Sequence, residues 1–155
     1  MKPLLVVDGY NIIGAWGEPE KQGWTMDECR DRLLHMLQDY AGYSGEEVEL
    51  VFDGYLSDRR TRSVDEVGGV RVVFTMHAET ADSYIERLVA HVPKYRQVRV
   101  ATSDGLEQSQ VLSTGATRLT SRELLRELKQ QRSAGFSQQH RGGLQRRSLE
   151  DRLSP

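Results

Sequence analysis

The chain has 155 residues, 37% of them hydrophobic and 28% charged, with a net charge of −2, as in one soluble globular domain. It has no apolar run of transmembrane length, which argues against a membrane partner. Cys29, the only cysteine, excludes an internal disulfide and a cysteine-rich zinc site. The first residues lead directly into a strand pattern and leave no room for a signal peptide, so we expect a cytoplasmic protein.

The first predicted element is a strand at residues 4–7, a short apolar run that ends in Asp8. A run of this length without polar alternation is typical of a strand buried on both faces of a parallel sheet. Ligands of open α/β sheets bind beyond the carboxyl ends of the strands, and Asp8 lies there. Asn11 follows within one turn.

The rest of the chain alternates helices with short apolar strands. After a loop at 14–24, a capping box at Thr25 and Glu28 starts a helix that stops near Gly42. Four more strands are predicted at 48–52, 70–74, 98–101 and 116–119. Helices are predicted from 81 to just before Pro93, at 106–112, and from 121 to about 133, whereas 55–69 is read as polar loop.

This order predicts a three-layer, Rossmann-like α/β domain at residues 1–133 with a mostly parallel five-stranded sheet. Residues 134–155 are expected to form a basic tail, polar and mobile at 137–143 and helical at 144–153. Charge supports this division, because residues 1–117 hold 12 basic and 19 acidic residues, whereas 118–155 hold nine and four. The final Ser-Pro resembles a helix start, so we expect the natural chain to continue.

Acidic residues follow three of the predicted strands: Asp8, Asp53 and Asp104, with Glu79 and Asp82 after the strand at 70–74. In a parallel sheet all five would gather at one edge. Clustered carboxylates repel one another unless a cation compensates them, and hard oxygen ligands favour Mg²⁺ or Mn²⁺. We therefore expect these five acids to hold a metal ion that activates a water for attack on phosphorus. For Asp53, a structural role in its turn is an equally good interpretation.

Other polar residues near this edge suit a nucleic-acid ligand. Asn11, Thr102 and Ser103 could bond a metal-bound water or a phosphate oxygen. Arg59, Arg60 and Arg62 follow Asp53 and could grip an RNA backbone, although a solvated loop would look the same.

Four segments together resemble the YacP-like NYN-domain proteins of the PIN-like nuclease superfamily: VVDGYN at 6–11, VFDG at 51–54, ETADSYIE at 79–86 and VATSD at 100–104. The resemblance covers nearly the whole chain. It implies a Rossmann-like sheet, bound Mg²⁺ or Mn²⁺, and endoribonuclease activity on single-stranded RNA, with messenger RNA as the expected target. Asp8, Glu79, Asp82 and Asp104 match the acidic site, with Asn11 beside it. Family members are bacterial or plastid proteins, and some work in contact with ribosomes.

The main alternative is a non-catalytic RNA- or ribosome-binding module that keeps the fold. The set of acids argues against it, because a carboxylate pocket does not help to bind a polyanion. A receiver domain and a haloacid-dehalogenase phosphatase fit less well. The former needs paired acids after the first strand and a later lysine, and the latter needs a second Asp two residues beyond Asp8.

Overall fold

The computed structural model describes residues 1–103 and 115–142, and side chains as far as residue 131. Six strands form one sheet in the order β3-β4-β2-β1-β5-β6, in which every neighbouring pair is parallel except β3 and β4. The strands are β1 Leu4–Asp8, β2 Glu47–Phe52, β3 Ser63–Val67, β4 Val70–Phe74, β5 Val98–Ala101 and β6 Thr117–Leu119. The mostly parallel α/β fold is therefore confirmed.

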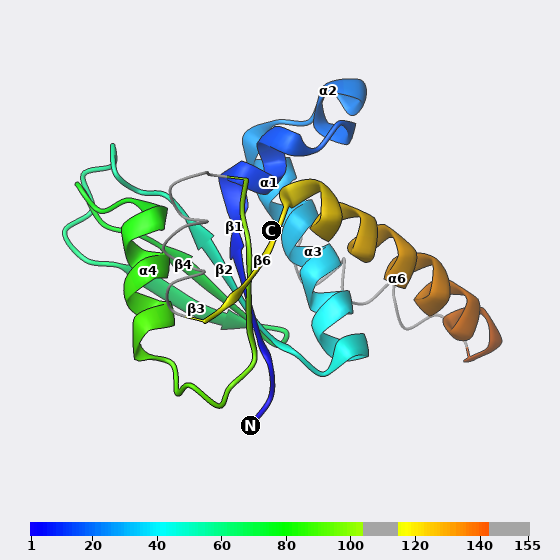
Figure 1. Cartoon of the computed structure of the whole chain (residues 1–155). Helices are drawn as coiled ribbons and strands as arrows, with labels where there is room; N and C mark the ends of the chain where they lie inside the picture. Colours follow the sequence, from blue (N-terminus) through cyan, green and yellow to red (C-terminus); the bar gives the residue numbers. More distant parts are fainter. Residues whose placement is uncertain (104–114, 143–155) are drawn as a thin grey trace.

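Helices cover both faces of the sheet. They are α1 Gly9–Ala15, α2 Glu18–Gln22, α3 Met26–Ser44, α4 Ala81–His91 and α6 Ser121–Gly142. Helix α4 lies on one face, and α3 and α6 lie on the other, with α1 and α2 beyond the carboxyl end of β1 (Figure 1).

The predicted number of five strands is wrong, because residues 63–67 form the extra strand β3. This strand pairs on one side only, antiparallel to β4, and Asp65 and Glu66 are exposed on it. Gly68 and Gly69 make the connecting turn with φ angles of 56° and 85°, which glycine adopts readily. A strand exposed at the edge has no need of buried side chains, so its sequence does not show the period that marks buried strands.

Two additional helices and two helix ends also differ from the prediction. Residues 9–15 and 18–22 form short helices, although 14–24 was expected to be loop. Helix α3 has the predicted capping box at Thr25 but continues to Ser44 before Gly45 ends it with a φ of 76°. Helix α6 runs to Gly142, through residues expected to be irregular. The predicted helices at 106–112 and 144–153 lie outside the described residues.

Successive side chains of a strand pack into two apolar layers, one on each face of the sheet. This alternation determines which face the last residue of each strand lies on. Leu5 and Val7 pack with α1, α3 and α6, whereas Leu4 and Val6 pack with α4. Since successive strand side chains point to opposite faces, Asp8 lies on the α4 face. This layer assignment determines which of the predicted site residues can meet.

Candidate active site

Asp8 ends the central strand β1 and is 7% exposed. Its neighbours in the sheet are Val51 of β2 and, one residue beyond the Val7–Ala101 pair, Thr102 after β5. Thr102 is fully buried. Asp8 therefore lies at the middle of the carboxyl edge, on the face that α4 covers.

Asp53 follows β2 and ties this edge to the start of α4. Its Oδ1 accepts a hydrogen bond from the Tyr55 backbone N–H at 2.7 Å, and its Oδ2 accepts one from the Ala81 N–H at 3.2 Å. Both carboxylate oxygens thus hold backbone groups. The structural interpretation of Asp53 is the one that these contacts favour.

Asp82 is in the first turn of α4, next to Ala81, and is half-buried. Thr80 caps the helix by accepting from the Ser83 N–H at 3.0 Å. A carboxylate in a first helical turn is stabilised by the helix dipole. The structure thus brings Asp8, Asp53 and Asp82 to one face of one sheet edge.

Glu79 is 6% exposed and is paired with two arginines. Arg62 Nε donates to its Oε1 and Oε2 at 2.8 and 3.0 Å, and Arg87 donates to its Oε2. The Met76 N–H also bonds its Oε1 at 3.3 Å. The Arg62 hydrogen bonds hold the pKa of the Glu79 carboxyl below its ordinary value of 4.5, despite burial. Glu79 is thereby an anchor for two guanidinium groups.

The Glu79→Gln variant should lower the free energy of unfolding at pH 7 by about 1–3 kcal/mol, because it removes a charged acceptor from a buried site. A carboxyl whose folded pKa is depressed stabilises the fold above its unfolded pKa, and this contribution is lost as pH falls through the folded pKa. Urea titrations from pH 7 to pH 3 should therefore show the two proteins converging below about pH 4.5. A constant difference over that range would contradict the assignment. Glu66→Gln, at an exposed ion pair, should change stability by less than about 0.5 kcal/mol.

Asn11 lies on the other face of the edge, with α1 and α6. Its Oδ1 accepts from the Ser103 N–H at 2.9 Å and from the Ser121 hydroxyl at 2.6 Å. Ser121 is fully buried, and its own N–H approaches the Ser103 hydroxyl at 3.4 Å. Asn11 therefore joins the end of β5 to the start of α6, and its carbonyl oxygen is occupied by protein groups.

The basic loop after Asp53 is divided between the two faces. The Arg59 guanidinium lies 4.8 Å from the centre of the Phe74 ring, in the layer of α1 and α3, while Arg62 lies 5.1 Å from the Tyr84 ring of α4. Arg60 is exposed. Backbone bonds from His77 to Arg59, at 2.8 Å, and from Ala78 to Tyr55, at 3.0 Å, fix this loop against the segment that leads to α4. Arg62 therefore lies on the face of Asp8, whereas Arg59 lies on the other face.

Two functional candidates had no signal in the sequence analysis. Arg87 reaches Glu79 from the middle of α4, eight positions along the chain, which is not a spacing that helical periodicity pairs. Ser121 begins the last predicted helix, and its bond to Asn11 spans 110 positions.

No three His, Cys, Asp or Glu side chains are grouped to hold a metal ion within the part of the chain that the structure describes. Asp104, which the sequence places two residues beyond Thr102, is outside that part. Asp8 and Asp82 are oxygen donors of the kind that Mg²⁺ and Mn²⁺ prefer. The oxygen donors of this edge therefore fit a hard divalent cation. Two of the carboxylates, those of Asp8 and Asp82, lie on one face within the described part of the chain.

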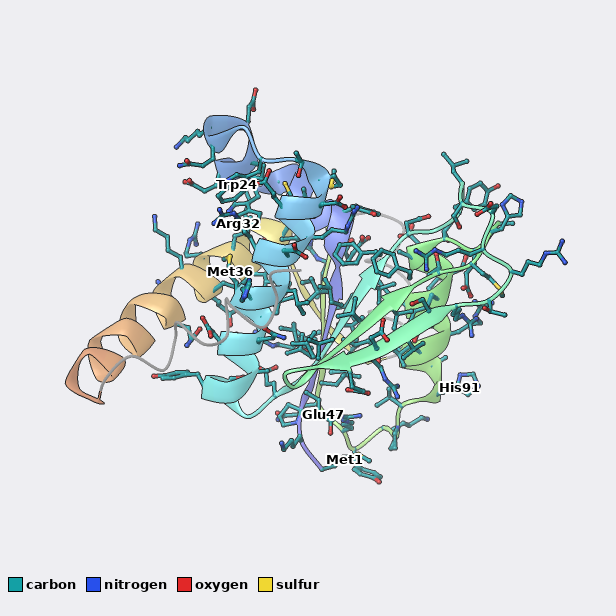
Figure 2. The ribbon with its side chains drawn as sticks, turned by 180° about the vertical axis from the view of Figure 1, so that it is seen from behind. Met1, Trp24, Arg32, Met36, Glu47 and His91 are labelled. Carbon is teal, nitrogen blue, oxygen red and sulfur yellow. The ribbon has the colours of Figure 1, made fainter. Side chains whose placement is uncertain are left out.

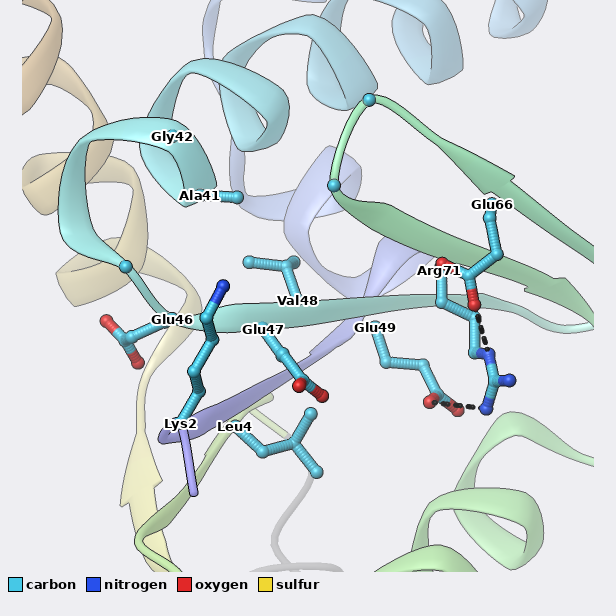
Figure 3. Close-up of a pocket in the computed structure, with 13 residues that line it drawn as sticks. Lys2, Leu4, Ala41, Gly42, Glu46, Glu47, Val48, Glu49, Glu66 and Arg71 are labelled. Atoms are coloured by element: carbon cyan, nitrogen blue, oxygen red, sulfur yellow. Dashed lines mark hydrogen bonds and ion pairs between the residues drawn. The ribbon is translucent and has the colours of Figure 1, made fainter.

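A cavity of about 630 Å³ lies at the opposite edge of the sheet, between the start of β2, the end of α3 and the β3–β4 hairpin. Its acids are already engaged: Arg71 contacts Glu66 and Glu49 there (Figure 3), Glu47 pairs with Arg96, and Glu46 pairs with Arg99. These ion pairs favour a structural role for the charges lining the cavity.

Aromatic residues border the α1–α3 side of the carboxyl edge. Trp24 and Arg32 lie side by side at the start of α3, far from Glu47 at the other end of the sheet (Figure 2). The Trp16 ring contacts Trp24 edge-on at 5.3 Å. These rings pack against the core, so they stabilise the α1–α2 segment.

In residues 1–103 and 115–142, no helix is both long and apolar enough to span a membrane.

The sheet and its two helical layers define a mostly parallel, three-layer α/β domain with acidic residues at its carboxyl edge. The sequence matches the YacP-like NYN domain family over residues 5–155, and the chain belongs to that family. A curated relative is the uncharacterized protein YacP of Bacillus subtilis, which is 39% identical over 127 residues, or 81% of this chain and 74% of YacP.

Two crystal structures of Rae1 (YacP) from Bacillus subtilis resemble this fold. A W164L mutant of Rae1 superposes with a TM-score of 0.74 and 34% identity, over 97% of this chain and 89% of the other. A second Rae1 structure gives a TM-score of 0.72 and 37% identity, over 89% and 79% of the two chains. The predicted family and fold are confirmed.

Proposed function

We propose that this protein is an endoribonuclease that uses Mg²⁺ or Mn²⁺ to hydrolyse phosphodiester bonds of single-stranded RNA. The observation that carries the proposal is the placement of Asp8 and Asp82 on one face of the carboxyl edge, within a nuclease-type fold. Messenger RNA in the cytoplasm, at or near ribosomes, is the target that we propose from the family resemblance.

We assign the cation to Asp8, Asp82 and Asp104. A bound divalent ion would supply a water of lowered pKa and would stabilise the leaving oxygen. Burial of Asp8 beside Thr102 limits the water around its carboxylate, which strengthens its attraction for a cation.

We assign the remaining predicted site residues roles in positioning other groups. Asn11 fixes the Ser103 backbone, and Asp53 fixes the start of α4. Glu79 holds the two arginines at the side of the edge. These assignments divide the five expected acids into three that we propose as ligands of the ion and two that position other groups.

Metal removal tests the proposal directly. Protein treated with EDTA should leave a circular single-stranded RNA intact, and added Mn²⁺ or Mg²⁺ should linearise it at least roughly 100-fold faster, since metal stabilisation of several kcal/mol corresponds to that factor. A circular substrate has no ends, so its linearisation reports internal cleavage. Cleavage that persists in EDTA would contradict metal dependence, and RNA binding without cleavage under every metal would favour the non-catalytic module.

A further inference from the structure

Arg62 and Arg87 come from different elements and meet on one buried carboxylate. Arg62 precedes β3 and Arg87 lies in the middle of α4, and both donate to Glu79, whose side chain is 5% exposed. Two guanidinium groups and one carboxylate leave a net charge of +1. The Arg62 guanidinium also lies over the Tyr84 ring, 5.1 Å from its centre, in a cation–π contact.

Both arginines have N–H donors that the bonds to Glu79 do not use. The Arg62 and Arg87 side chains are 37% and 56% exposed, and the bonds to Glu79 occupy Nε and one terminal nitrogen of Arg62 and one terminal nitrogen of Arg87. A guanidinium carries five N–H donors in a planar fork that matches phosphate oxygens. Because Glu79 already fixes the two groups, little side-chain entropy remains to be lost when an anion binds.

This pair lies on the same face of the sheet as the proposed cleavage residues. Asp53 and Asp82 flank the start of α4, and Glu79 lies three positions before Asp82 on the segment that enters the helix. Arg59, in contrast, lies over Phe74 on the other face. If the scissile phosphate of an RNA strand lies at Asp8, a neighbouring phosphate of the same strand would therefore lie at Arg62 and Arg87.

We infer that Arg62 and Arg87, held by Glu79, form a phosphate-binding subsite that grips the RNA backbone beside the cleavage site. The inference rests on the proposed function for the identity of its ligand. It assigns Arg87 a contact with substrate and gives Glu79 the part of a positioning residue, which orients the two arginines.

The test measures RNA binding without cleavage. A fluorescent single-stranded RNA is titrated with the natural chain and with Arg87→Gln in EDTA, at several salt concentrations. Each lost phosphate contact should reduce the slope of log affinity against log salt by about 0.7, and binding should weaken several-fold at low salt. Arg87→Lys keeps a cation and should keep the slope.

Arg71→Gln is the matched control, because Arg71 is 49% exposed and pairs with Glu66 and Glu49 at the opposite edge (Figure 3). It removes the same charge and should leave the slope unchanged. Equal slopes for all proteins, an equal loss for Arg71→Gln and Arg87→Gln, or an equal loss for Arg87→Lys and Arg87→Gln would each overturn the subsite. The last result would show that Arg87 acts only through the fold.

The outcome separates this subsite from the proposed activity. If the natural chain binds RNA with the expected slopes but never cleaves it with Mn²⁺, the nuclease assignment fails and the subsite stands. If the chain cleaves RNA but Arg87→Gln binds with the natural slope, the subsite fails and the nuclease assignment stands. If the natural chain does not bind RNA, the subsite is overturned.

Discussion

Replacing Asp8 with Asn should slow cleavage of single-stranded RNA by about 100- to 1,000-fold, the loss typical when one preorganised electrostatic group is removed from an active site. Asn has the shape of Asp, so it fits a position that is 7% exposed. It lacks the negative charge, and a neutral amide at this buried edge cannot balance a divalent cation. The measurement is the single-turnover rate with saturating Mn²⁺, beside the unfolding temperature of each protein.

Two further variants make the result specific. Asp65→Asn makes the same chemical change on the exposed edge strand β3 and should leave the rate unchanged. Asp82→Asn should lose about as much as Asp8→Asn, and the double variant should lose little more, because residues that act as one unit are not additive. Equal rates for Asp8→Asn and the natural chain would remove the basis for assigning the cation to this edge.

The sequence predicts the centre of the fold well because the central strands are buried on both faces. Such strands need mostly apolar runs, and β1 is a continuous one that ends at Asp8. Strand β2 from Val48 onward and strand β5 each hold one charged residue within an otherwise apolar run, and they end before Asp53 and Thr102. Parallel order then places those ends at one edge. The register that pairs Asp8 with Val51 confirms this step of the argument.

The edge strand β3 and the partners of Glu79 could not be predicted in the same way. Strand β3 has one neighbour, so hydrogen bonding to β4 and the Gly68–Gly69 turn define it without a buried face. The Arg62–Glu79 pair spans 17 positions and depends on how two loops lie together. A count of acids after strands treats Glu79 like any other acid at this edge and does not show that two guanidinium groups hold it.

Residues at the carboxyl edge also lie on different faces of the sheet. Their assignment to a face required the layers that the structure shows. Asn11 and Asp8 are three positions apart, yet Asn11 bonds Ser103 and Ser121 on the α6 side while Asp8 lies on the α4 side. The sequence predicted that the two lie near one another along the edge. It did not show that Asn11 would bond Ser103 and Ser121.

The Gly54→Ala variant should lower the free energy of unfolding by about 3 kcal/mol or more, at the upper end of overpacking effects. A Cβ at Gly54 would lie 1.8 Å from the backbone oxygen of Thr75, which cannot move as a flexible side chain can. The Gly54 N–H donates to the Thr75 hydroxyl at 2.6 Å, and that hydroxyl donates to the Glu79 carbonyl at 2.7 Å. Relief of the clash would therefore pull apart the ends of β2 and β4.

Gly42→Ala is the matched control, since Gly42 is inside α3 and a Cβ there meets no heavy atom within 4 Å. Alanine favours the helix by about 1 kcal/mol, so the same substitution should raise the melting temperature by roughly 2–4 °C at Gly42 and lower it by roughly 6–12 °C at Gly54. Thermal unfolding followed by circular dichroism would measure both. Equal melting temperatures for Gly54→Ala and the natural chain would mean that β2 and β4 do not approach at Thr75. Asp53 would then lack the fixed loop that joins it to α4.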